Sequence, residues 1–281
     1  MGSLEFSGEG RLGVVEVKAA VYNLNKLDVF HLFKEVLGFV LYMHEQIPTC
    51  LQHMEREFDS LKEEYGQLET SNSDEVDRKV TFQRKNKMKR TDIKQRIKKL
   101  EKLMNCISGL LSAMREAIDE IPNFWGFMLV LGGSLSRPEY VYEVFFDHVT
   151  LDPCSAKDSS TSKIGDILSR KAIQALLTNT AENFSYSGPK KLFLLIKCPS
   201  SFNLPLHFLP KRDYRYSKKV CPIKLYIKGK VGDQSMNDVP SKSEKPSFGC
   251  SAAYFNETDM IWYQCRHSVK GLVSKSEETD C

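Results

Sequence analysis

The sequence predicts an α+β domain whose largely antiparallel sheet is backed by helices. Three observations support this class. Residues 93–118 carry a long amphipathic pattern, residues 124–131 form a continuous apolar run, and further short apolar runs follow, separated by polar loops. Because strands and helices are mixed without strict alternation, a largely antiparallel sheet with helices on one face is favoured.

The first part of the chain predicts an early strand and a buried helix. Valines within residues 14–21 indicate the strand. Residues 28–46 (DVFHLFKEVLGFVLYMHEQ) are apolar nearly all the way round a helix, which is typical of a helix in the middle of a domain. Pro48 is expected to end this helix. Apolar residues at three- and four-residue spacing over 51–65 predict a second helix or a helical extension.

The longest predicted helix occupies the middle of the chain. From Ile93 to Ile118, apolar residues alternate at spacings of four and three, as in a heptad repeat. Leu103 and Leu110 widen this stripe beyond a narrow seam, so packing on a sheet is favoured over coiled-coil dimerisation. The preceding residues 66–90 have little periodicity and many charges, which predicts a flexible basic loop.

The remaining elements follow from apolar runs and turn residues. Residues 124–131 (FWGFMLVL) predict a central strand, and 140–146 alternate as its hairpin partner after a turn at Gly132-Gly133. A third helix is predicted over 163–184, which Gly188-Pro189 stops. Further strands are predicted at 192–196, 223–228 and 260–265.

These elements are expected to form a single domain over residues 11–273, between polar tails at 1–10 and 274–281. The chain start has no basic segment followed by an apolar stretch, as a signal peptide requires. The longest strongly apolar run, 36–43, is too short to span a bilayer. We therefore expect a nuclear and cytoplasmic protein without a membrane partner. A net charge of only +4 implies no global binding of polyanions.

The sequence offers no persuasive chemistry. Its eight cysteines lie at irregular spacings without a C-x-x-C pair, which indicates packed, reduced thiols. Cys265 and His267 have no second ligand pair nearby, so no metal is expected. A nucleophile elbow, a zinc-protease motif, a phosphate loop and a dinucleotide fingerprint are all absent. We expect a non-enzymatic protein without a cofactor.

A basic run ends the predicted loop 66–90. It is interpreted as a solvated loop, as a nuclear-import signal or, more weakly, as a nucleic-acid contact. Because the run has one interleaved aromatic, Phe82, and no stacking platform, no direct nucleic-acid partner is expected. The import candidates are Arg84, Lys85, Lys87, Lys89 and Arg90.

The predicted third helix carries apolar residues on two opposite sides, although a surface helix needs only one apolar face to dock on a sheet. The other face is either covered by another part of the chain or left as an exposed binding patch. The pattern does not decide which face docks. One face holds Ile164, Ile167, Leu168, Ala172 and Ala175, and the other holds Ile173, Leu177, Ala181 and Phe184.

Four segments resemble the comet-type HORMA proteins, the partners of the spindle-checkpoint Mad protein. None is a catalytic motif, and their order agrees with the elements predicted above. They are LYMHEQIP (41–48), LVLGGSLSRPEYVYE (129–143), FLPKRDYRYS (208–217) and DMIWYQCRHSVKGL (259–272).

The resemblance implies a HORMA fold, in which three helices back a largely antiparallel sheet and a C-terminal "safety belt", here residues 200–273, is mobile. It also implies that the chain binds the closed form of another HORMA-domain protein, mainly through the third helix, and presents it to a hexameric AAA+ ATPase. The implied partner contacts are Tyr42, Met43, Glu45, Arg170, Ile173, Gln174 and Leu177. The implied ATPase contacts are Pro210 and Lys211.

Several alternatives stay open. The cargo is a checkpoint protein or a HORMA protein of the meiotic chromosome axis. Residues 93–118 could instead drive self-association of a structural component of meiotic chromosomes. An enzyme of unrecognised type would need a deep polar pocket with converging ionisable groups. If the chain is an adaptor, we expect it in the nucleus and cytoplasm, and on chromosomes or kinetochores during division.

Overall fold

The computed structural model describes residues 14–18, 23–70, 80–121, 124–147, 150–152, 163–180, 188–228 and 259–272. The helices in this part of the chain are α1 (Lys26–Met43), α2 (Leu51–Thr70), α3 (Val80–Glu120) and α4 (Lys163–Thr180). The strands are β1 (Val14–Lys18), β2 (Asn23–Asn25), β3 (Gly126–Ser134), β4 (Arg137–Asp147), β5 (Thr150–Asp152), β6 (Lys191–Pro199), β7 (Phe208–Lys211), β8 (Ile223–Lys228) and β9 (Met260–Lys270).

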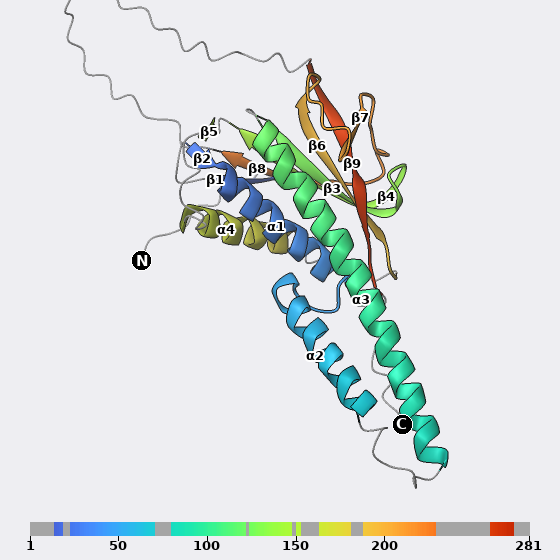
Figure 1. The fold of residues 1–281 in the computed structure, drawn as a ribbon. Coiled ribbons are helices and arrows are strands. Elements are labelled where there is room, and N and C mark those ends of the chain that lie inside the picture. The colour runs from blue at the N-terminus through green and yellow to red at the C-terminus, as the bar shows by residue number, and fades with distance from the viewer. Residues whose placement is uncertain are drawn as a thin grey trace, which may run out of the picture.

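Within the described residues, seven strands form one sheet in the order β1-β8-β4-β3-β6-β9-β7. Most neighbouring strands are antiparallel, but β8 runs parallel to both β1 and β4. Helices α1, α3 and α4 lie over one face of the sheet, and α2 lies beside the half of α3 that extends past the sheet (Figure 1). The predicted α+β class with a largely antiparallel sheet is therefore confirmed.

Helix α1 packs against both α3 and α4. It begins with a capping box: the Asn25 side chain accepts a hydrogen bond from the Asp28 backbone at 2.6 Å, and the Asp28 carboxylate accepts one from the Asn25 backbone at 3.4 Å. The helix ends at Met43, well before Pro48, so Pro48 does not end it as predicted. The chain leaves the helix because Glu45 adopts a left-handed conformation, with φ of 52°.

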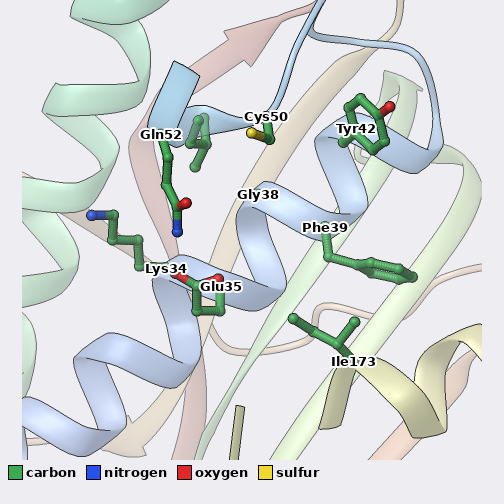
Figure 2. A pocket seen from close by; sticks show the side chains of 9 residues that line it. Lys34, Glu35, Gly38, Phe39, Tyr42, Cys50, Gln52 and Ile173 are labelled. Carbon is green, nitrogen blue, oxygen red and sulfur yellow. The ribbon is translucent and has the colours of Figure 1, made fainter. Parts of the chain in front are cut away.

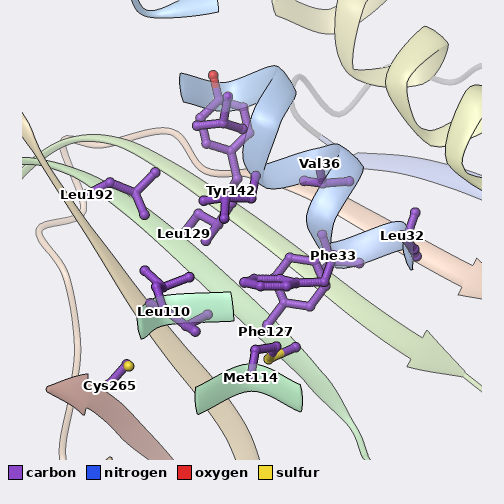
Figure 3. Close-up of a cluster of buried hydrophobic side chains, with 14 of the residues drawn as sticks. Leu32, Phe33, Val36, Leu110, Met114, Phe127, Leu129, Tyr142, Leu192 and Cys265 are labelled. Atoms are coloured by element: carbon purple, nitrogen blue, oxygen red, sulfur yellow. The ribbon is translucent and has the colours of Figure 1, made fainter. Parts of the chain in front are cut away.

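The main core lies between α1, α3 and the sheet, as Figure 3 shows. Phe33 of α1 meets Phe127 of β3 edge to face, with ring centroids 5.1 Å apart. Leu110 and Met114 of α3 are fully buried in the same core. The heptad stripe is thus used inside the chain, as expected for a helix lying on a sheet.

The prediction of a loop over residues 66–90 is wrong for the residues that the structure describes. Residues 66–70 continue α2, and residues 80–90 form the first three turns of α3. As a result, α3 starts well before Ile93, where the apolar periodicity became clear. Residues 80–90 are helical because they pack beside α2. The apolar periodicity of residues 80–90 alone gives no sign of this packing.

We call α2 together with residues 80–103 of α3 the helical arm. Leu61 of α2 and Ile93 of α3 are both buried in it. Lys89 pairs with Glu64 across the two helices at 2.9 Å, and Arg90 pairs with Glu69. Such exposed ion pairs contribute little each, so apolar burial is the main stabilising term in the arm.

The turn between β3 and β4 lies later than predicted. Gly132 and Gly133 belong to β3, and the chain turns at Leu135 and Ser136. Irregular pairing surrounds Gly132, where an added Cβ would lie 2.5 Å from the Arg137 carbonyl oxygen. Glycine is therefore required there by close approach of the backbones rather than by a turn.

The other predicted strands are present, with longer bounds in some cases. β8 matches residues 223–228, while β9 extends past 265 to Lys270. The short strands β2, β5 and β7 were not predicted. The third predicted helix is α4, which ends at Thr180 in the part of the chain that the structure describes. Ala181 and Phe184 of that prediction lie outside the described residues, as do residues 229–258 of the predicted belt.

Candidate partner-binding site

A groove of about 280 Å³ opens where the end of α1, the start of α2 and the middle of α4 meet (Figure 2). Phe39 of α1 and Ile173 of α4 lie together on one side of it, and Tyr42 stands one turn further along α1. Charged side chains stand at the rim, so the groove suits an apolar side chain with polar neighbours. Its lining residues are Lys34, Glu35, Gly38, Phe39, Tyr42, Cys50, Leu51, Gln52 and Ile173.

Close backbone approach brings the three helices together. A Cβ on Gly38 would lie 3.0 Å from the Leu51 side chain, so the absence of a side chain lets α2 start against α1. A Cβ on Gly165 would lie 2.6 Å from the Asp28 carboxylate, which places α4 equally close to the start of α1. His31 and Asp166 also pair across α1 and α4 at 3.1 Å.

Buried Gln46 fixes the turn that follows α1. Its side-chain amide nitrogen donates to the His44 carbonyl at 2.5 Å, and its side-chain oxygen accepts from the Lys190 backbone at 2.6 Å. Its backbone carbonyl accepts from the Leu272 amide at 2.9 Å. The end of α1, and with it Tyr42, is therefore tied to the start of β6 and to the segment after β9.

His44 lies beneath this turn and is buried against β4. Its Nε2 atom lies 2.7 Å from the Tyr142 hydroxyl oxygen. Burial, and secondarily the positive charge of Lys190, lowers the pKa of His44 to about 4. The imidazole is therefore neutral near pH 7 and acts as a packed, hydrogen-bonded core group rather than as a surface contact.

The structure decides which face of the third predicted helix docks. Leu168, Ala172 and Leu176 are buried beneath α4. On the opposite side Ile173 is half-buried at the groove and Leu177 is 43% exposed. Ile167, grouped by periodicity with the docking face, is 50% exposed. Part of the second apolar face is thus open to solvent.

The residues implied as partner contacts gather on one side of the molecule. Tyr42 and Ile173 line the same groove, and Tyr42 is 52% exposed. Leu177 lies one turn beyond Ile173 on α4 and is exposed, so apolar surface is present next to the groove. Arg170, Gln174 and Glu45 are exposed, and Met43 is half-buried.

The implied ATPase contacts lie elsewhere. Pro210 and Lys211 are exposed on β7, whose one described neighbour is β9 at the edge of the sheet. Proline suits this position because an edge strand can leave a backbone position without an N–H donor. α4 contacts β1 and β8, which are at the other edge of the sheet. Helix α4 and strand β7 are therefore at opposite edges of the sheet.

The import candidates are brought to neither surface. Arg84, Lys85, Lys87 and Lys89 are exposed, and Arg90 is half-buried beside the Tyr65 ring. All five are on the helical arm rather than in a loop.

Sequence reasoning missed part of the groove. It did not include Phe39, Cys50 or Gln52, because the turn at Glu45 that returns the chain across α1 was not foreseen. The available signal was the apolar stripe over 51–65, whose first residue is Leu51.

No family model and no curated protein matches this chain. In the part of the chain that the structure describes, no group of three or more His, Cys, Asp or Glu side chains is arranged to hold a metal ion. No helix in the described ranges is both long enough and apolar enough to cross a bilayer.

Proposed function

We propose that this protein is a non-enzymatic adaptor that binds the closed form of a HORMA-domain protein and presents it to a hexameric AAA+ ATPase. The proposal combines the four-segment resemblance with one structural observation. Two packed helices expose large apolar side chains: Tyr42 of α1 lines the groove, and Leu177 lies one turn beyond the groove-lining Ile173 on α4. Exposed apolar residues bordered by polar side chains are typical of protein-binding surfaces.

The composition of this surface supports a protein partner. Tyr42 offers an aromatic ring with a hydroxyl, a type enriched at the centres of interfaces. Arg170 and Gln174 stand beside the apolar strip and suit a polar rim. None of the described groups with a perturbed pKa lines the groove, and His44, whose pKa is lowered by burial, packs against β4 instead. This arrangement favours binding over catalysis.

The separation of the two surfaces supports an adaptor. A cargo on α1 and α4 leaves β7 accessible at the other edge of the sheet, so a second protein can bind at the same time. Two modest contacts in one ternary complex raise the effective concentration of cargo at the ATPase without a new strong interface. Preference for closed cargo requires contacts that only the closed form offers.

The first experiment tests cargo binding by the full chain, with a purified closed checkpoint HORMA protein and a meiotic axis HORMA protein as separate probes. Leu177→Asp and Ile173→Asp should each reduce affinity at least about tenfold, because a charge would be buried in the interface. Ile167→Asp is the matched control, since Ile167 is exposed on another side of the same helix. Unchanged binding by both groove variants would refute the proposed surface.

The second experiment separates cargo binding from ATPase engagement. Lys211→Glu should lower cargo-dependent ATPase stimulation and leave cargo affinity unchanged. Lys219→Glu makes the same charge change at another exposed position and should stimulate like the wild type. Equal stimulation by the wild type and Lys211→Glu would remove β7 from the proposal.

Self-association through the heptad helix is less well supported. Leu100, Leu103 and Ile107 are buried in the chain's own core, so this stripe has little apolar surface left for a second copy. Light scattering tests the alternative: a dimer that Leu100→Asp disrupts would favour it.

A further inference from the structure

The helical arm carries a straight line of cations on its solvent side. We call Arg84, Lys87, Lys94, Lys98 and Lys102 the basic stripe. They recur at spacings of three, four and seven residues, which places them on one face of α3. All five are exposed. At about 1.5 Å per residue, the stripe is about 27 Å long.

The stripe is opposite the side by which α3 packs. Ile93 and Leu100 point into the arm and are buried. The cations that pair with α2, namely Lys89, Arg90 and Arg96, lie on that inner side. No ion pair within the described residues involves a cation of the basic stripe.

The local charge is strongly positive. Residues 84–102 contain ten Lys or Arg and two acids, Asp92 and Glu101. The acids of α2 lie across the arm, where Glu57, Glu64 and Glu69 approach the inner cations. The arm therefore has a basic outer face even though the net charge of the whole chain is only +4.

We propose that the basic stripe binds the phosphate backbone of duplex DNA without sequence preference. From sequence, nucleic acid was discounted because the basic run has one interleaved aromatic, Phe82, and no stacking platform, but contact with a duplex backbone needs no such platform. Because residues 84–102 are helical, the five cations of the stripe form a rigid row that can neutralise several phosphates at once, since duplex DNA carries about one charge per 1.7 Å of its axis. The stripe is away from the groove and from β7, so this binding is independent of the adaptor function.

Three observations favour a duplex over other anionic partners. No residue from 84 to 102 is aromatic, so the stripe offers no platform for unpaired bases. The apolar side of α3 is occupied by α2, so it is not available to enter a membrane surface. Among the described side chains beside the stripe, the one large apolar group that is exposed is Met88, at 72%, which is too little for the apolar centre of a protein interface.

Fluorescence anisotropy of a labelled mixed-sequence DNA duplex, titrated with the full chain, tests the proposal. The logarithm of the affinity should fall linearly with the logarithm of KCl concentration, with a slope of about −4.5 for five phosphate contacts. The triple variant Lys94→Gln, Lys98→Gln and Lys102→Gln should bind at least about tenfold more weakly at low salt and reduce the slope by about 3. The matched control, Lys191→Gln, Lys218→Gln and Lys219→Gln, removes the same charge from exposed positions outside the arm and should bind like the wild type.

Several outcomes would overturn the proposal. These are the absence of duplex binding at low salt, equal binding by the stripe and control variants, and tighter binding of single-stranded DNA than of duplex. Stronger association with phosphatidylserine vesicles or polyglutamate than with duplex would assign the stripe to those partners instead. Circular dichroism of each variant shows that the fold is kept, and the salt slope of the wild type tests the proposal without any substitution.

Discussion

The Nε2 atom of His44 lies 2.7 Å from the hydroxyl oxygen of Tyr142, and both side chains are buried. The pair joins the end of α1 to β4 directly beneath the turn that presents Tyr42. Lys190, which lies over the Tyr140 ring, adds a positive charge on the same side of the histidine. Protonation of His44 should therefore affect both the stability of the fold and the position of the end of α1, which lines the groove.

This pair predicts lower stability in mild acid. The pKa of His44 is lowered to about 4 in the folded state, mainly by burial, whereas the unfolded chain has a pKa of 6.5. Below pH 6.5 the unfolded chain takes up a proton that the folded chain does not, so stability falls between pH 6.5 and pH 4. From pH 7 to pH 5 this group should cost about 2 kcal/mol. In urea unfolding, His44→Gln should lose about 2 kcal/mol less than the wild type over that interval. Equal losses would contradict the assignment.

The contact between Gly271 and Gln46 predicts a large effect from a single methyl group. A Cβ on Gly271 would lie 2.0 Å from the Gln46 side-chain oxygen, which already accepts a hydrogen bond from the Lys190 amide. Gly271→Ala should therefore destabilise the fold by about 2–4 kcal/mol, through overpacking and a strained buried hydrogen bond. Gly133→Ala, where nothing lies within 4 Å of the added Cβ, is the control. Thermal unfolding compares them, and similar melting temperatures for both variants would show that the turn is not held as described.

The left-handed conformation of Glu45 predicts opposite effects on stability and binding. A non-glycine residue there costs about 1 kcal/mol or more, so Glu45→Gly should leave stability unchanged or raise it by up to about 1 kcal/mol. If the Glu45 carboxylate contacts the cargo, the same variant should bind more weakly. Glu45→Ala keeps the strain and removes the carboxylate, so it should match Glu45→Gly in binding alone. Denaturant unfolding measures the stability of each variant, and cargo titration measures its affinity. A marked loss of stability in Glu45→Gly would refute the predicted effect on stability.

The helical arm should unfold separately from the sheet. Ile93 is buried in the arm, in an apolar cluster that is continuous with the core under the sheet, so Ile93→Asp should expose amides of α2 and the first half of α3 to hydrogen exchange. Amides of β3 and β6 should keep their protection. Leu110→Asp, in the main core, is the contrasting variant and should weaken protection throughout. Uniform loss of protection in Ile93→Asp would mean that the arm and the sheet form one cooperative unit.

The sequence predicted best where apolar burial is continuous and local. The residues of α1 and β3 are covered on nearly all sides, so their composition alone identified both elements. The first turns of α3 were misassigned because their stability depends on α2: Lys89 and Arg90 look like loop cations until Glu64 and Glu69 stand opposite them. The apolar periodicity of one segment gives no information about a second segment that packs against it and stabilises it.

The candidate site shows the same limit. Periodicity separated the two faces of α4, and the structure was needed to show that Leu168 docks while Leu177 is exposed. The groove itself depends on the turn at Glu45. Because glutamate rarely adopts a left-handed backbone conformation, its presence at this position did not predict a turn. The short strand β7 was missed because four residues containing Pro210 give no alternating pattern and become a strand only by pairing with β9.

The parallel pairing of β1 with β8 has a consequence for biosynthesis. Val14 pairs with Lys224, so β1 gains its partner in the sheet only after β8, about 210 residues later in the chain, has emerged from the ribosome. Such distant pairing favours slow closure and leaves a nascent valine-rich segment exposed during translation. A nascent chain halted before residue 223 should therefore depend on chaperones that shield this segment.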